Sequence, residues 1–450
     1  MEFLLISSIM SSNKENIEEE INSSISFEKE TRDRVAKLKE SLIEDPHGST
    51  TTVFATTVLQ KEQDDIFLDG CSESVSTLIK DKAVTLRQSY HSFDFNGKAI
   101  ITLGLNSILD LSFKYPAAQA KLFKRNQRKQ LDALFPSKTY PVDSYDYIKE
   151  LLASLNGCYN KNKSKEANWT TIYKELKRLD NIYDHERDIS HNDTGFCVHF
   201  LLHIMSIIKH QPHLFLEEVD TSEWDYIVGF WGVVSGRLFH GSGLHLKWGD
   251  THLTVYDTVS DLILKVDLRI LHDRIRQGQN VETDIGAMEA AEEQPGDAKY
   301  TFDRCKVLLE SKAMIDRFLL DGCLVDSVDS LQICGLEAHF VNLTLEAPGA
   351  YIGTQFYTGC IGNSMSNIVR HLDLAIHLLC FRDQCISVMN QCENHLSEAR
   401  SRKVSAKRSY SQLPRDDLVV KQESVRGSWN PPRSSKSPPP PTPENLFGKH

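Results

Sequence analysis

The stretch that decides the fold runs from Asp220 to Tyr357, and its centre reads Leu262-Ile-Leu-Lys-Val-Asp-Leu-Arg-Ile-Leu271. In the second half of this segment apolar and charged residues alternate, which is the pattern of a β-strand with one buried face. The residues of the two faces are Val266, Leu268 and Ile270 on one side and Lys265, Asp267 and Arg269 on the other. The segment therefore predicts a strand that carries a carboxylate between two basic side chains.

Around this strand, helical and extended segments follow one another. A helix begins near Ser222, where a hydroxyl can cap free backbone amides and acidic residues suit the positive end of the helix dipole. The expected elements are a helix at Ser222–Leu238, strands at Leu244–Tyr256 and Leu262–Leu271, an acid-flanked piece at Glu282–Glu292, a helix at Ala298–Leu320, and strands at Leu331–Leu345 and Ala350–Tyr357. This order predicts an α/β domain. One or two further helices are expected over Ser366–Ala399, docked on the sheet, and Gly97–Gly104 is expected to form a strand.

The composition of the 450-residue chain is ordinary for a globular protein, with 40% hydrophobic and 25% charged residues. Its net charge of −11 argues against a protein that coats nucleic acid, because phosphate contacts need an excess of Lys and Arg. The ten cysteines are scattered and form no Cys-x-x-Cys pair, which argues against a zinc ribbon and indicates reduced thiols.

Four parts are expected along the chain: a disordered N-terminus (1–25), a mostly helical N-terminal region (26–195), an α/β core domain (196–395) and a disordered basic tail rich in Ser and Pro (396–450). No stretch approaches the ~20 apolar residues that a membrane span needs, and no signal peptide is recognisable. We therefore expect an intracellular protein without a membrane partner. The basic clusters Arg400–Lys403 and Lys407-Arg408 in the tail predict nuclear import.

The predicted helix Ala298–Leu320 has an unusual charged pair. At about 100° per residue, its apolar residues form one stripe, made of Phe302, Cys305, Leu308, Leu309, Ile315 and Leu319. Lys312 and Asp316 fall in the middle of this stripe, where either charge alone would be costly to bury. They are four residues apart, so they can pair with each other. Alternatively, Lys312 reaches across to the sheet.

Two resemblances bear on this region. The segments Ser222–Trp231, Leu246–Asp250, Lys265–Arg269 and Lys312–Asp316 resemble a group of uncharacterised proteins from early-diverging (Mucorales-type) fungi. That resemblance covers roughly Asp220–Cys380 and implies no activity. The order helix, three strands, helix, strand is similar to the core of the PD-(D/E)xK nuclease superfamily, which implies a restriction-endonuclease-like fold.

The second resemblance also implies a set of site residues. Asp267 would be the first metal ligand, and Glu289 or Asp284 on the next strand the second, so that the acids hold Mg²⁺ and activate an attacking water. Neither Glu289 nor Asp284 is followed by the expected Lys two residues later. Lys312 would supply the missing cation, which makes Asp267, Glu289 and Lys312 the expected catalytic residues.

Two functions remain open on this basis. One is a divalent-metal-dependent nuclease, or an inactive descendant that still binds nucleic acid or protein. The other is a non-catalytic interaction or regulatory protein that is controlled through its C-terminal tail and its protein partners. The residues alone do not decide whether the protein is an enzyme.

Overall fold

The computed structural model describes residues 66–112, 118–183, 193–216, 218–254, 263–276, 279–406 and 425–429. The chain divides into two compact units, one made of Met1–Gln60 with Arg274–Val281 and the other of all remaining residues. The α/β architecture belongs to the second unit. The expected disordered N-terminus (1–25) and most of the expected tail, including Lys407-Arg408, lie outside the described residues.

Short 3₁₀ turns aside, the described residues form helices and strands with the following bounds, in chain order. They are α3 (Val75–Leu86), α4 (Phe95–Leu105), β1 (Ile108–Asp110), α5 (Arg125–Leu134), α6 (Asp146–Cys158), α7 (Lys165–Tyr183), α8 (Asp193–His210), α9 (Glu223–Tyr226), α10 (Gly232–Leu238), β2 (His245–Thr254), β3 (Ile263–Arg276), β4 (Gln279–Ala291), α11 (Gly296–Leu320), β5 (Ser327–Cys334), β6 (Glu337–Ala347), β7 (Ala350–Cys360) and α12 (Ile368–Ala406).

The strands form one mixed sheet in the order β1-β7-β6-β5-β4-β3-β2. Strand β2 is antiparallel to β3, β5 to β6, and β6 to β7, whereas β4 is parallel to β5 and β1 to β7. Helix α11 makes the connection between β4 and β5, as a parallel pair requires a crossover. The expected α/β class is confirmed, and so is the buried face of β3, because Val266, Leu268 and Ile270 are fully buried.

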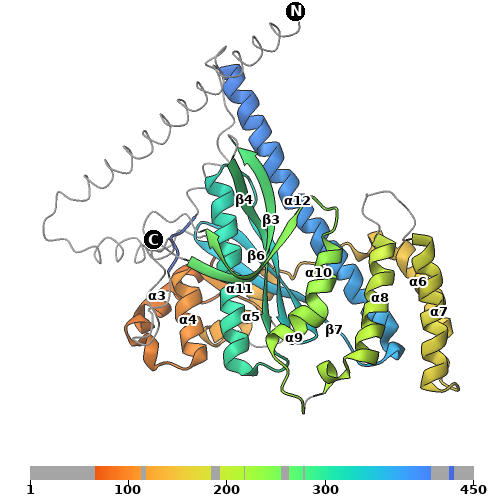
Figure 1. Ribbon diagram of the computed structural model, residues 1–450. Coiled ribbons are helices and arrows are strands. Elements are labelled where there is room, and N and C mark those ends of the chain that lie inside the picture. The colour runs from red at the N-terminus through yellow and green to blue at the C-terminus, as the bar shows by residue number, and fades with distance from the viewer. Residues whose placement is uncertain are drawn as a thin grey trace, which may run out of the picture. The chain divides into compact units, whose positions relative to one another are not determined.

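Long helices cover the two faces of the sheet (Figure 1). On one face, a Cβ added to Gly353 of β7 would lie only 2.8 Å from Leu308 of α11. On the other face, a Cβ on Gly359 would lie 2.6 Å from Leu374 of α12. Glycine at these two positions lets each helix approach the sheet closely. Side chains that point from the centre of the sheet toward α11 are therefore enclosed between two packed layers.

The helix expected at Ser222–Leu238 is present, but it is built from two helices, α9 and α10, joined by one π-helical turn at Ile227–Trp231. Ser222 caps it as expected, since its backbone amide and hydroxyl both bond the Asp225 carboxylate. The buried indole of Trp231 donates to the carbonyl of Gly335 at 2.7 Å. This bond fixes the start of the core against the turn between β5 and β6.

Two expectations were wrong in detail. Gly97–Gly104 is not a strand but part of α4, capped by Asp94, whose carboxylate accepts from the amide of Gly97. A short apolar run does not distinguish a buried helix from a buried strand. Leu331–Leu345 is not one strand but the end of β5 and most of β6, because Gly335 at φ +57° makes the turn between them.

The N-terminal helical region and the tail both join the core. Strand β1, from the region expected at 26–195, pairs with β7 in the sheet. Helix α12 continues beyond residue 396 to Ala406, and Ser428 and Trp429 in the described tail segment are buried. Among the helices of the described residues, none has the length and apolar composition that crossing a bilayer requires.

Candidate functional site

Asp267 lies opposite a bulge in the neighbouring strand. Trp248 of β2 pairs with Leu268 and Thr251 pairs with Val266, so two β2 residues face Asp267 alone. The amide of Asp267 donates to Glu289 Oε1 at 3.2 Å, and Asp267 Oδ2 accepts from the amide of Ala290 at 3.0 Å. Asp267 and Glu289 are therefore brought together across β3 and β4, as the sequence predicted.

Helix α11 presents a stripe of four charged residues at a spacing of three or four, which places them on one face. They are Lys299, Asp303, Lys306 and Glu310. Lys299 Nζ bonds Asp303 Oδ1 at 3.0 Å. Lys306 Nζ bonds Glu289 Oε2 and lies 3.7 Å from Asp267 Oδ1. The ammonium of Lys306 thus occupies the space between the two carboxylates from the sheet.

Glu223 at the start of α9 completes the group, since its carboxylate lies 3.8 Å from Lys299 Nζ. Burial raises the pKa of Glu223, and the nearby Asp267 carboxylate raises it further. We call Glu223, Asp267, Glu289, Asp303 and Glu310, with Lys299 and Lys306, the acidic cluster. Five acids against two lysines leave it three charges negative if every group is ionised.

The acidic cluster has an open end and a closed end. Side chains at the open end keep part of their surface in water, with 43% for Lys299 and 29% for Glu223. At the closed end, Glu289, Asp303 and Glu310 are almost completely buried. Glu223 and Lys299 are thus the members of the acidic cluster that solvent reaches most. Open depressions along α7 and between α8 and α10 include no residue of the acidic cluster.

The closed end holds two carboxyl groups in contact, those of Glu289 and Glu310. Burial raises the pKa of Glu289 to about 8, against the opposing effect of Lys306, and burial with the Glu289 charge raises the pKa of Glu310 well above its ordinary value. Both oxygens of Glu310 are buried and have no hydrogen-bond donor among the described residues. Two such groups in contact require a shared proton or a cation.

Hard carboxylate oxygens of this kind suit Mg²⁺ or Mn²⁺. Asp267 and Glu289 would hold the ion in place of the Lys306 ammonium, and the donor-free oxygens of Glu310 would face it. Lys306 has a flexible stem and lies partly exposed, so it can turn toward the open end. There it would stand beside an anionic ligand of the metal.

Asp284, the other acid expected as a metal ligand, lies elsewhere. Its two oxygens accept from the guanidinium of Arg269 at 2.6 and 2.9 Å. A bidentate pair of this kind satisfies the carboxylate. Asp284 is thus not part of the acidic cluster.

Lys312 does not supply the cation either, which corrects the sequence-based expectation. Six residues separate it from Lys306, so the two side chains leave α11 about 120° apart. Its ammonium bonds Asp316 Oδ2 at 2.6 Å, which is the pair within the helix that their spacing predicted. The lysine between the sheet acids is Lys306.

A second group of ligand atoms lies at the edge of the sheet. Atoms of His245, Asp273 and Glu282 lie within 4.8 Å of one another. His245 already contacts Asp273 at 2.6 Å, and Glu282 is bonded by Lys247 at 2.9 Å. All three side chains are roughly one-third or more exposed, so this group is a weaker candidate than the acidic cluster.

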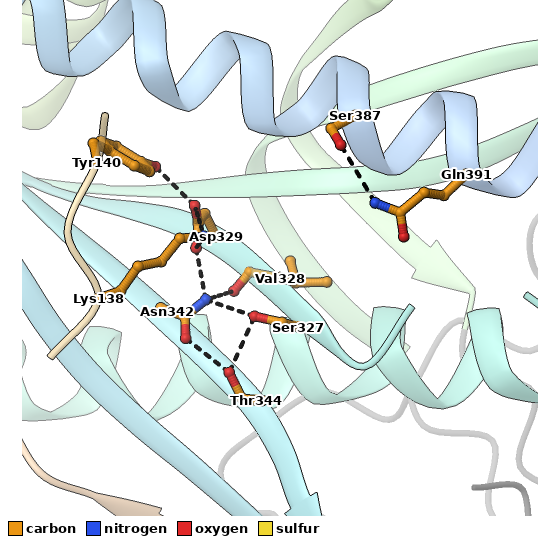
Figure 2. A network of polar contacts seen from close by, with 9 residues as sticks. All are labelled: Lys138, Tyr140, Ser327, Val328, Asp329, Asn342, Thr344, Ser387 and Gln391. Carbon is orange, nitrogen blue, oxygen red and sulfur yellow. Dashed lines mark hydrogen bonds and ion pairs between the residues drawn. The ribbon is translucent and has the colours of Figure 1, made fainter. Parts of the chain in front are cut away.

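The opposite face of the sheet shows what a satisfied buried acid looks like. Asp329 of β5 accepts from Lys138 Nζ at 2.8 Å, from the Tyr140 hydroxyl at 2.8 Å and from Asn342 Nδ2 at 2.7 Å, as Figure 2 shows. This network has a donor for each carboxylate oxygen. Glu310 has none among the described residues, and that contrast distinguishes a structural acid from a candidate ligand.

The sequence analysis missed Lys306 and Glu310. One signal could have found them, namely the alternation of Lys and acid at helical spacing along α11. The apolar stripe was a poor guide, because Phe302, assigned to its buried side, is 62% exposed. No protein-family model, no curated protein and no solved structure matches the chain.

Proposed function

We propose that the acidic cluster binds a divalent cation and that the protein hydrolyses phosphodiester bonds in nucleic acid. In this proposal Asp267 and Glu289 ligate the ion, and Lys306 stabilises negative charge on the phosphate. The observation that carries the proposal is the buried Glu310 carboxyl beside Glu289, because neither of its oxygens has a donor among the described residues. A cation would neutralise that pair without a proton.

The fold supports the same proposal. Helices α9 and α10, strands β2, β3 and β4, helix α11 and strand β5 follow one another in the order expected of a PD-(D/E)xK core. Asp267 stands on the second of these strands and Glu289 on the third. The lysine comes from α11 instead of β4, and it reaches the same two carboxylates.

The chemistry follows from the positions of these groups. Asp267 and Glu289 would hold the divalent ion, which would supply a nucleophile at neutral pH by lowering the pKa of a bound water. Burial opposes the charge of Lys306, but its acidic neighbours, among them Glu289 and Asp267, together raise its pKa, which favours the charged ammonium. From the open end of the acidic cluster it can neutralise charge on the phosphate as the bond breaks.

The first test is titration of the full chain with Mn²⁺ and Mg²⁺ by calorimetry. We expect binding in the wild type and its loss in Asp267→Asn. Asp273→Asn is the matched control, because it removes a carboxylate from the weaker candidate group at the sheet edge. Binding that survives Asp267→Asn and disappears in Asp273→Asn would place the metal at that edge instead.

The second test is cleavage of single- and double-stranded DNA and RNA with each metal. Lys306→Met should retain metal binding and lose cleavage, since methionine keeps the stem and removes the charge. Cleavage that is unchanged in Lys306→Met would remove this residue from the mechanism. If the wild type binds neither metal, the proposed activity fails and the non-catalytic interaction protein remains.

A further inference from the structure

The described part of the tail, Val425–Trp429, is a segment without helix or strand that packs on the core. Its Arg426 carbonyl and Ser428 hydroxyl contact Lys312 of α11, and Trp429 contacts Asn106 at the end of α4. Ser428 and Trp429 are buried, with 7% of each surface exposed. The segment thus fills a site that other parts of the chain have built.

Lys312 explains half of this site. Its ammonium is fully buried and has three N–H donors. One goes to Asp316, and the other two go to Arg426 O at 2.6 Å and Ser428 Oγ at 3.1 Å. Without the tail segment, two donors of a buried cation would lose their acceptors. The tail segment therefore supplies the two acceptors that Lys312 needs besides Asp316.

Asn106 explains the other half. Its side-chain amide donates to the carbonyl of Trp429 at 2.9 Å, and its side-chain oxygen accepts from the amide of the same residue at 2.8 Å. Two reciprocal bonds to one residue's main chain are the way a neighbouring strand holds an extended peptide. The Trp429 ring meets Tyr90 edge-on, at 5.6 Å between ring centroids. The core thus contacts the main chain of Trp429, the hydroxyl of Ser428 and the indole ring of Trp429.

We infer that Lys312, Asn106 and Tyr90 form a peptide-binding site for a segment that ends in Ser-Trp, and that Val425–Trp429 occupies it as a displaceable internal ligand. The hydrogen bonds to Lys312 and Asn106 and the ring contact with Tyr90 support this inference, because a bound peptide is held by contacts of the same kinds. They join Arg426, Ser428 and Trp429 to the core through polar atoms and one aromatic ring. The inference does not depend on the acidic cluster or on the proposed activity.

The test uses the full chain and a fluorescein-labelled peptide of residues 421–433, with binding followed by fluorescence anisotropy. The wild-type chain should bind the peptide at least tenfold more weakly than Trp429→Ala, because its own segment competes for the site. In the peptide, alanine in place of Trp429 should weaken binding to the Trp429→Ala chain by at least tenfold. Equal affinity of the two chains, or of the two peptides, overturns the inference.

A second measurement needs no substitution. In the wild-type chain, hydrogen exchange of the Trp429 amide should be slowed, because this amide is bonded to Asn106. It should still be faster than that of α11, because a ligand dissociates without global unfolding. Exchange together with α11 would make the segment part of the core. Exchange as fast as in an unfolded peptide would mean that the site is empty. Either result overturns the inference.

Discussion

Replacing Glu310 with Gln should stabilise the protein at neutral pH. Glu310 is fully buried, and its two oxygens have no donor among the described residues. Its pKa is raised well above the ordinary 4.5, first by burial and then by the Glu289 charge, so the folded state keeps its proton while the unfolded state releases it. The folded state therefore binds more protons, and the stability it loses grows as pH rises.

The size of the effect follows from this linkage. Each pH unit above the unfolded pKa costs about 1.36 kcal/mol as long as the folded carboxyl stays protonated. The penalty therefore begins near pH 4.5 and grows at this rate until the folded carboxyl ionises. Gln has the same shape and never ionises, so the gain from Glu310→Gln should be almost nothing near pH 4.5 and should rise by about 1.36 kcal/mol per pH unit above it.

Urea unfolding in EDTA, at several values between about pH 5 and about pH 8, measures this difference. Glu282→Gln is the matched control, because a hydrogen bond from Lys247 lowers the pKa of Glu282 and gives the opposite sign. Its substitution should destabilise the protein at neutral pH, and the effect should fade as pH falls. If Glu310→Gln keeps the wild-type dependence on pH, Glu310 does not hold a proton, and the reasoning about the closed end is refuted.

Three further outcomes are expected. Lys312→Met should cost about 3–5 kcal/mol in urea unfolding, because the buried Asp316 carboxylate loses its cationic partner and keeps only neutral donors such as the Tyr351 hydroxyl; an unchanged midpoint would contradict the full burial of Lys312. Gly353→Ala should cost about 1–3 kcal/mol by the same measurement, since its Cβ would lie 2.8 Å from Leu308, and Gly157→Ala, where nothing lies within 4 Å, is its control. Mn²⁺ should raise the melting temperature of the wild type more than that of Asp267→Asn. Equal shifts would mean that Asp267 does not bind the ion.

Local patterns determined several parts of this protein. Alternation of apolar and charged residues predicted the strand that carries Asp267, and its apolar side is buried. The acids and hydroxyl at Ser222 predicted a helix start, which the bond to Asp225 confirms. The spacing of Lys312 and Asp316 predicted their pair. Each of these depends on residues only a few positions apart, where backbone geometry settles which side chains meet.

The tertiary structure alone decided the content of the candidate site. Helix α11 is buried on nearly every side, so its apolar stripe could not show which face meets the sheet. Packing against β3 and β4 selected the face of Lys306 and Glu310, and turned Lys312 toward a segment 114 residues further along the chain. Such contacts depend on how whole elements pack, and no local pattern in the chain records that choice.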